Sequence, residues 1–242
     1  MLSISFIIPC YNGEKFISHN IKKIIRETKK LKIDYELIII NDGSKDNTTF
    51  KVNKLKKFFK KIKFINLQKN YGKSFSVRKG LAISKFNHVI LIDADLPYFP
   101  YISNIVNELK KNIDLAMVDR NDSRSILINK PLSLYQFCRK NIGKLISKII
   151  FYILDINLGP IDTQAGLKGF KKNNQFIKNK FLSKKFFFNF ELIYLYVKSK
   201  KKISTIPVRY KIEENSSIKL FSIKNVLVIL DFIKVIALLK FK

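Results

Sequence analysis

The stretch HVILIDADLPYF, residues 88–99, joins a run of apolar residues to a pair of carboxylates. Side chains alternate along a strand, so residues i and i+2 lie on the same face. If the extended run continues this far, Asp93 and Asp95 lie side by side. Two carboxylates held close together repel, and each raises the pKa of the other unless a cation sits between them. The pair therefore indicates a divalent metal or a shared proton; the alternative is a solvated turn after a strand.

The first half of the chain repeats this alternation of short apolar runs and helical stretches. Strands are expected at 4–8, 35–40, 63–67 and 89–92, and helices at about 15–30 and 73–84, with a lysine-rich helix between the second and third strands. Continuous apolar strands separated by helices predict a mostly parallel sheet covered on both faces. The expected fold class is therefore α/β, with one main domain over residues 1–212.

Polar clusters follow three of the expected strands directly, at 11–13, 41–44 and 93–95. Parallel sheets bind ligands in the crevice at the carboxyl ends of their strands. We therefore expect the three clusters to meet in one crevice, which favours a functional role for Asp93 and Asp95.

Composition narrows the class of protein further. The 242 residues are 47% hydrophobic and carry a formal net charge of +29. Such a charge favours nucleic acid or anionic membranes as partners. Because the lysines are scattered over nearly every segment, and the GxxG spacing of Gly166 and Gly169 stands alone, we expect no nucleic acid partner. No GxGxxG or GxxxxGK[ST] motif supports a dinucleotide or P-loop site.

The two cysteines, Cys10 and Cys138, provide no disulfide framework, which favours a reducing compartment. The N-terminus lacks the charged start of a signal peptide. Two histidines are too few for a histidine-rich metal site.

The last stretch, 223–241, is mostly apolar but contains Asp231 and Lys234. A spanning helix needs about 20 apolar residues and rarely carries charges near its middle. We therefore expect 213–242 to form an amphipathic helix in the membrane interface, with a core-packing helix as the alternative. A second apolar and basic segment, 142–154, is a candidate to join it there.

Six motifs carry a resemblance to a known family. They are FIIPCYNGEKF (6–16), LIIINDGSKDNT (37–48), NYGKSFSVRKG (70–80), LIDADL (91–96), DTQAGLKGF (162–170) and FNFELIYLY (188–196). In this order they resemble the family 2 glycosyltransferases, which have the Rossmann-like GT-A fold. The last two are similar to the branch that makes polyprenyl-phosphate sugars, such as dolichyl-phosphate glucosyltransferase and dolichyl-phosphate mannose synthase. The resemblance covers nearly the whole chain.

The resemblance implies a nucleotide-sugar donor, with UDP-glucose favoured and GDP-mannose possible. Negative charge builds on the departing diphosphate, and Mg²⁺ or Mn²⁺ held by Asp93 and Asp95 would neutralise it. In the family, residues at the positions of Pro9, Tyr11 and Asp42 contact the nucleoside. The full set expected at the nucleotide-sugar is Pro9, Tyr11, Asn12, Asp42, Lys73, Arg78 and Asp93. For Lys73, a surface charge at a helix start is the alternative.

The resemblance also implies a polyprenyl phosphate acceptor and an inverting displacement. A phosphate oxygen is already ionised, so it needs cations to position it, whereas a sugar hydroxyl needs a general base. Arg120 and Arg139 map to the two arginines of the branch that hold this phosphate, and with Asp95 they are the expected catalytic residues. Asp162, Gln164 and Glu191 are expected to line the sugar or acceptor pocket, with buried structural hydrogen bonds as the alternative.

Five positions depart from the family pattern. Asn41 replaces the first Asp of the usual DDGS, and Gly13 stands where this branch often has Glu. Residues 118–119 are Val-Asp where Gly-Ser is usual, which weakens the assignment of Arg120. Pro97 stands where mannose synthases often carry a metal-binding Gln, which favours the glucosyl type.

Three other functions stay open from the sequence. One is a family 2 enzyme that glycosylates a sugar hydroxyl in surface polysaccharide synthesis, with Glu191 or Asp162 as its base. Another is a non-catalytic, basic protein that binds membranes or polyanions, and the departures also leave open a site that has lost its activity. The leading hypothesis predicts a cytoplasmic enzyme, peripheral on the cytoplasmic face of an anionic membrane, with an unknown oligomeric state.

Overall fold

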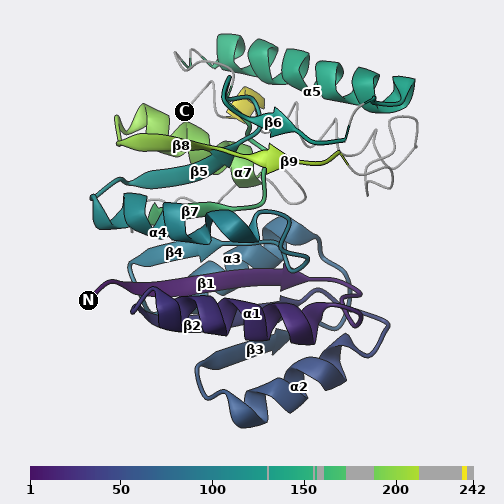
Figure 1. Cartoon of the computed structure of the whole chain (residues 1–242), viewed down its shortest axis with the longest axis vertical. Coiled ribbons are helices and arrows are strands. Elements are labelled where there is room, and N and C mark those ends of the chain that lie inside the picture. Colours follow the sequence, from purple (N-terminus) through teal and green to yellow (C-terminus); the bar gives the residue numbers. More distant parts are fainter. Residues whose placement is uncertain (130, 155, 157–160, 173–187, 213–235, 239–242) are drawn as a thin grey trace.

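The computed structural model describes residues 1–129, 131–154, 156, 161–172, 188–212 and 236–238. Within this part, seven strands form one sheet in the order β3-β2-β1-β4-β7-β5-β8, and β6 and β9 pair separately (Figure 1). The strands are β1 (Ser3–Cys10), β2 (Asp34–Asn41), β3 (Ile62–Asn66), β4 (His88–Leu91), β5 (Leu115–Asp119), β6 (Ile126–Leu127), β7 (Lys168–Lys171), β8 (Ile203–Pro207) and β9 (Arg209–Tyr210). β7 runs antiparallel to both of its neighbours, β4 and β5, and the other pairs are parallel. The prediction of a mostly parallel sheet is confirmed.

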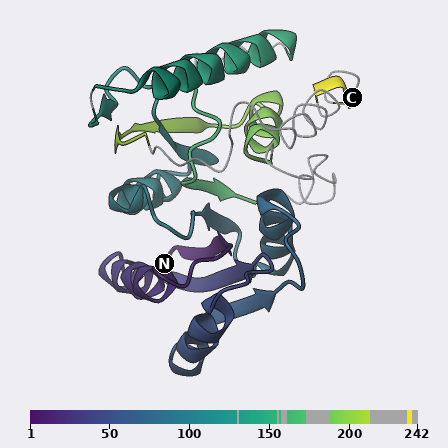
Figure 2. The same ribbon diagram turned by 90° about the vertical axis from the view of Figure 1, so that its right-hand side faces the viewer.

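Helices cover both faces of the sheet, as predicted (Figure 2). One face carries α1 (Ile17–Lys30), α2 (Thr48–Phe58) and α4 (Ile102–Lys110), and the other carries α3 (Lys73–Ile83), the end of α5 (Leu134–Ile153) and α7 (Phe188–Lys198). A short 3₁₀ turn, Phe99–Tyr101, precedes α4. Ile8 of β1 packs on the first face and Ile7 on the second, and both are buried. A strand buried on both sides needs the continuous apolar run that the sequence supplies.

β1 continues through Pro9 to Cys10, although a stop at Pro9 was expected. The Ile7 carbonyl accepts from the Ile92 amide on the β4 side. Pro9, two residues further, faces the same side, where β4 has already ended. The missing N–H of Pro9 therefore falls beyond the end of β4, where the ladder between the two strands has stopped.

β4 ends at Leu91, one residue before the expected end, so the condition under which Asp93 and Asp95 would lie side by side on an extended strand is not met. Asp93 and Asp95 lie in a turn closed by a hydrogen bond of 3.0 Å from the Leu96 amide to the Asp93 carbonyl. Asn20 of α1 donates its side-chain amide to the Ala94 carbonyl at 2.8 Å and fixes this turn against the first helix.

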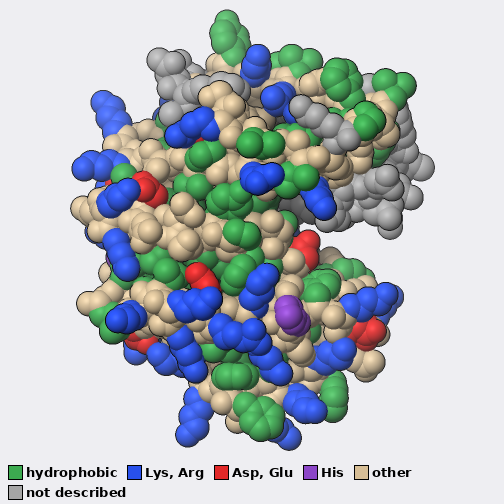
Figure 3. Space-filling model, in the orientation of Figure 1, with side chains coloured by type: hydrophobic (Ala, Val, Ile, Leu, Met, Phe, Trp, Pro, Cys, Tyr) green, Lys and Arg blue, Asp and Glu red, His purple; other side chains and the backbone are tan. Residues whose placement is uncertain are grey.

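α5 begins with a capping box, in which Ser133 and Gln136 satisfy each other's backbone amides. Besides Tyr135 and Ile153, five large apolar side chains on α5 are exposed: Leu134, Phe137, Leu145, Ile149 and Tyr152. The spacing of these five, three to eight residues, places them along one side of the helix. In Figure 3, hydrophobic side chains gather along the upper margin, where Figure 1 shows α5.

Most of the expected C-terminal helix, 213–242, lies outside the described residues. Residues 236–238 are helical, and Ile236 packs against the core that α3 and α7 cover. Across the described ranges, no helix combines the length and the apolar character that crossing a membrane requires.

Candidate active site

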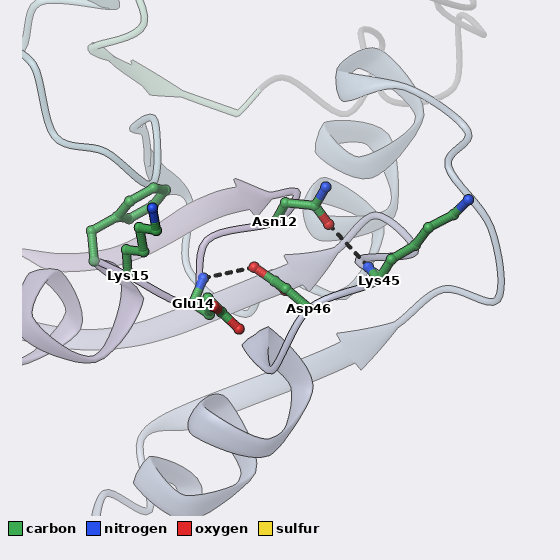
Figure 4. Close-up of a pocket in the computed structure, with 6 residues that line it drawn as sticks. Asn12, Glu14, Lys15, Lys45 and Asp46 are labelled. Carbon is green, nitrogen blue, oxygen red and sulfur yellow. Dashed lines mark hydrogen bonds between the residues drawn. The ribbon is translucent and has the colours of Figure 1, made fainter.

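The loops after β1 and β2 are joined by reciprocal hydrogen bonds (Figure 4). The Glu14 amide donates to Asp46 at 3.0 Å, and the Lys45 amide donates to the Asn12 side chain at 2.9 Å. These loops enclose a pocket of about 390 Å³ lined by Asn12, Glu14, Lys15, Phe16, Lys45 and Asp46. The polar clusters at 11–13 and 41–44 therefore meet at the carboxyl ends of β1 and β2, as expected.

Asp42, at the end of β2, holds the start of α3. Its two carboxylate oxygens accept from the backbone amides of Tyr71 and Gly72 at 2.8 and 2.9 Å. Gly72 has a φ of +94°, a conformation that glycine adopts without steric cost. This clamp fixes the backbone just before Lys73, the first residue of α3, and so sets the direction from which its side chain leaves the helix.

Lys73 forms an ion pair with Asp93. The ammonium contacts Oδ1, while Oδ2 lies against Gly166 so closely that a Cβ atom there would overlap the carboxylate. Both side chains are partly accessible, with 30% of Lys73 and 26% of Asp93 exposed. The structure thus brings together two of the predicted donor-site residues, from α3 and from the turn after β4.

A second ion pair joins Arg120, just after β5, to Asp162, in the segment that leads into β7. Nε and Nη2 of Arg120 donate to the two oxygens of Asp162, the second at 2.9 Å. Burial alone would raise the pKa of Asp162, but Arg120 outweighs it and holds this pKa below its usual range. Arg120 still has a third of its side chain exposed. It is therefore anchored on one side and accessible on the other.

Asp119 holds the backbone of this segment in place. One of its carboxylate oxygens accepts from the amides of Asn121 and Asp162 at 2.8 and 3.0 Å. Burial raises the pKa of Asp119, and the negative charge of nearby Asp162 adds to this effect. The departure from Gly-Ser at 118–119 thus supplies the group that fixes Asp162, and through it Arg120.

Lys168, the first residue of β7, is completely buried beside these pairs. Its ammonium donates to the Ala165 carbonyl, the one hydrogen-bond acceptor that the described residues give it. Burial lowers the pKa of Lys168 to about 7, while Asp162 and Asp93 oppose that shift. Because both carboxylates act on Lys168, the two ion pairs belong to one electrostatic cluster. Its basic groups are Lys73, Lys168 and Arg120, and its acidic groups are Asp93 and Asp162.

The other predicted residues are placed as follows. Asn12 is exposed and lines the pocket, Tyr11 is exposed in the same loop, and Pro9 is half-buried near the end of β1. Arg78 lies on α3 with its guanidinium 6.0 Å from the centre of the Phe75 ring. Gln164 is exposed, and its backbone amide donates to Oδ1 of Asp162 at 2.9 Å.

Glu191 is buried in the first turn of α7, and Asp95 is exposed in the turn after β4. Arg139 lies on α5, but its side chain falls outside the described residues. The assignments of these three residues stay predictions.

Four residues of this cluster were not predicted from the sequence: Lys168, Asp119 as a positioning group, Gly166 and Tyr98. Tyr98 is buried near Arg120 and Asp162, and burial raises the pKa of its phenol. A lysine alternating with apolar residues in DTQAGLKGF was a usable signal for Lys168, since a buried lysine in a strand is rare outside functional sites.

The described residues contain no group of three His, Cys, Asp or Glu side chains that would hold a metal ion alone. Asp93 and Asp95 supply hard oxygen ligands of the type that Mg²⁺ and Mn²⁺ prefer. Two carboxylates suit an ion that completes its coordination with phosphate oxygens and water, so the residues fit a metal bound together with a diphosphate.

Comparison with known proteins identifies the family. Residues 5–156 match the family model described as glycosyl transferase family 2. A dolichyl-phosphate beta-glucosyltransferase of Dictyostelium discoideum is 30% identical over 231 residues, 90% of this chain and 69% of that protein. One from Trichomonas vaginalis is 29% identical over 228 residues, 90% of this chain and 68% of that protein. The chain belongs to glycosyl transferase family 2.

An uncharacterised glycosyltransferase of Synechocystis is 34% identical over 120 residues, 49% of this chain and 38% of that protein. The chain thus spans 38% to 69% of the length of these relatives.

Among solved structures, glucosyl-3-phosphoglycerate synthase of Mycobacterium tuberculosis, in complex with Mn²⁺, UDP and phosphoglyceric acid, has a TM-score of 0.64. It is 17% identical, and the match covers 98% of this chain and 76% of that one. Mannosyl-3-phosphoglycerate synthase of Rubrobacter xylanophilus also has a TM-score of 0.64, at 12% identity, over 98% of this chain and 73% of that one. These likenesses establish the GT-A fold.

Proposed function

We propose that this glycosyltransferase transfers a hexose, with inversion, from a nucleotide-sugar to a polyprenyl phosphate, and that it favours UDP-glucose as the donor. Two ion pairs at the carboxyl ends of β4 and β5 carry the proposal. They are Lys73 with Asp93 and Arg120 with Asp162. A reaction between a diphosphate donor and a phosphate acceptor brings two anionic groups together, and it needs cations at two neighbouring places.

The donor half of the proposal rests on the loops after β1, β2 and β4. Asn12 lines the pocket, and Asp42 retains lone pairs for a base N–H beyond its two backbone bonds. A diphosphate held beside Asp93 would accept hydrogen bonds from the ammonium of Lys73. A bound Mg²⁺ or Mn²⁺ would supply charge neutralisation for the departing diphosphate.

The acceptor half rests on Arg120. Its planar guanidinium presents several N–H donors, so it can keep Asp162 and still donate to a phosphate oxygen from its exposed side. The paired Asp162, with its lowered pKa, is a weak general base. This favours an acceptor that is already ionised over the sugar hydroxyl that the alternative function requires. The relatives named dolichyl-phosphate beta-glucosyltransferase point to the same acceptor class.

The place of action that we propose is an anionic membrane surface. The exposed apolar stripe of α5, namely Leu134, Phe137, Leu145, Ile149 and Tyr152, is interspersed with Lys140, Lys144 and Lys148. Apolar side chains flanked by lysines suit the boundary between headgroups and acyl chains. Arg120 would then work close to the phosphate of a lipid that stays in the bilayer.

The test is a donor screen with a lipid readout. Purified protein, Mn²⁺ and a short polyprenyl phosphate are incubated with radiolabelled UDP-glucose, GDP-mannose or UDP-N-acetylglucosamine, and label is counted after extraction into organic solvent. We expect label from UDP-glucose, lost in Arg120→Ala. Label that enters only an added oligosaccharide would contradict the proposal and establish the hydroxyl-acceptor function.

A further inference from the structure

The ammonium of Lys73 pairs with the partly exposed carboxylate of Asp93. Oδ1 of the carboxylate is in contact with Nζ of Lys73, and Oδ2 lies directly against Gly166. A divalent cation that approaches Asp93 therefore meets a positive charge at one oxygen and backbone atoms at the other. Like charges at this separation repel strongly in a partly desolvated site.

We propose that Lys73 blocks the metal position while the nucleotide is absent, and that the donor diphosphate opens it by taking the Lys73 ammonium as its own partner. The inference rests on the proposed function, because it assumes that a diphosphate binds beside Asp93. Its consequence is that nucleotide and metal bind cooperatively, and linkage makes the coupling reciprocal.

The exchange requires only a side chain to move. Asp42 holds the backbone at Tyr71 and Gly72, so the start of α3 stays in place. Lys73 has a flexible four-carbon stem and is 30% exposed, which leaves it free to swing from a carboxylate to a phosphate.

The experiment measures Mn²⁺ binding by electron paramagnetic resonance, with and without UDP, so it needs no turnover. The proteins are the wild type, Lys73→Gln, and Lys69→Gln as a matched control. Lys69 lies four residues earlier, with Nζ 5.3 Å from the centre of the Tyr71 ring, and its removal changes the net charge equally. Urea unfolding of each protein checks that the fold is kept.

For the wild type, we expect UDP to strengthen Mn²⁺ binding by about tenfold or more, within the ordinary range of coupling between sites. For Lys73→Gln without nucleotide, we expect Mn²⁺ to bind about fivefold more tightly than to the wild type, and the gain from UDP to shrink. Lys69→Gln should match the wild type within about twofold. Adding Asp93→Asn to Lys73→Gln should abolish the gain, because the ion is held by Asp93.

Unchanged Mn²⁺ binding in nucleotide-free Lys73→Gln would overturn the inference and leave the proposed function standing. An equal rise in Lys69→Gln would also overturn it, because the effect would then come from net charge alone. If the wild type bound no Mn²⁺ even with UDP, both the inference and the metal-assisted reaction would fall.

Discussion

The guanidinium of Arg120 and the carboxylate of Asp162, 42 residues apart in the chain, face each other through two hydrogen bonds. Their meeting follows from the sheet, because Arg120 follows β5, Asp162 lies shortly before β7, and β5 and β7 are neighbours. This pair is the clearest link between the fold and the acceptor side of the proposed reaction.

The first prediction concerns the geometry of this pair. Arg120→Lys keeps the charge but loses the bidentate hydrogen bonding to Asp162, so we expect the free energy of unfolding to fall by about 1–2 kcal/mol. We also expect the KM for polyprenyl phosphate to rise about tenfold or more, with little change for the donor. Arg124→Lys is the control, because Arg124 and Asp122 form the same fork with an exposed guanidinium, where the loss of stability should be too small to resolve. Equal losses in the two variants, measured by urea unfolding, would show that partial burial adds nothing.

The second prediction concerns pH and Lys168. Its pKa is about 7 in the folded protein, against an ordinary value of 10.5. Between these two values the unfolded chain binds more protons than the folded one, so this group makes stability rise with pH. From pH 7 to 9 we expect a rise of about 2 kcal/mol in the wild type relative to Lys168→Met. The measurement is urea unfolding of both proteins at pH 7, 8 and 9. Parallel curves for the two proteins would mean that Lys168 keeps an ordinary pKa.

The third prediction compares two glycines of the same segment. An alanine at Gly166 would press on the Asp93 carboxylate, whereas one at Gly169 would press on Ile105 and Leu109 in the core. We expect Gly166→Ala to lower Mn²⁺-dependent activity by about 100-fold with little loss of stability. We expect Gly169→Ala to lower the free energy of unfolding by about 1–3 kcal/mol. Thermal melts and initial rates separate the two effects, and a purely destabilised Gly166→Ala would count against the close seat of Asp93.

The fourth prediction concerns the apolar stripe of α5. Leu145→Glu with Ile149→Glu should reduce binding to vesicles that contain phosphatidylserine by about tenfold or more, because the change removes apolar surface and adds negative charge. Phe50→Glu with Phe58→Glu on α2 is the matched control, since both phenylalanines are exposed and α2 lies at the far end of the molecule from α5 (Figure 1). Vesicle sedimentation at two salt concentrations measures both. Equal losses in the two double variants would refute a specific role for α5.

Much of this fold was predictable because its signals are local. Apolar runs such as 37–40 mark strands buried on both faces, and polar residues at their ends mark the crevice. The strand 168–171 was not expected, because four residues that include two lysines and a glycine have no clear strand pattern. Its position between β4 and β5 is a long-range property that local periodicity does not contain.

The sequence allowed us to predict which residues belong to the site, but not which residues contact one another there. Asp93, Asp42 and Asp162 were expected to face ligands, and the structure pairs each of them with a group of the protein itself. These partners come from the β3–α3 loop, from α3 and from the residue after β5, so only the folded sheet brings them together. Lys168 escaped notice because burial, rather than residue type, distinguishes it from the many other lysines.

The antiparallel strand β7 has a consequence for synthesis on the ribosome. It pairs Lys171 with His88 and Phe170 with Leu115, so β4 and β5 are not joined until the chain has grown to residue 171. Until then, the facing edges of β4 and β5 lack their shared partner, and open edges of this kind attract other strands. When β7 enters, it seats Gly166 against Asp93 and brings Asp162 to Arg120 in the same event. The close seat of Asp93 and the Arg120–Asp162 pair therefore form at the same stage of synthesis.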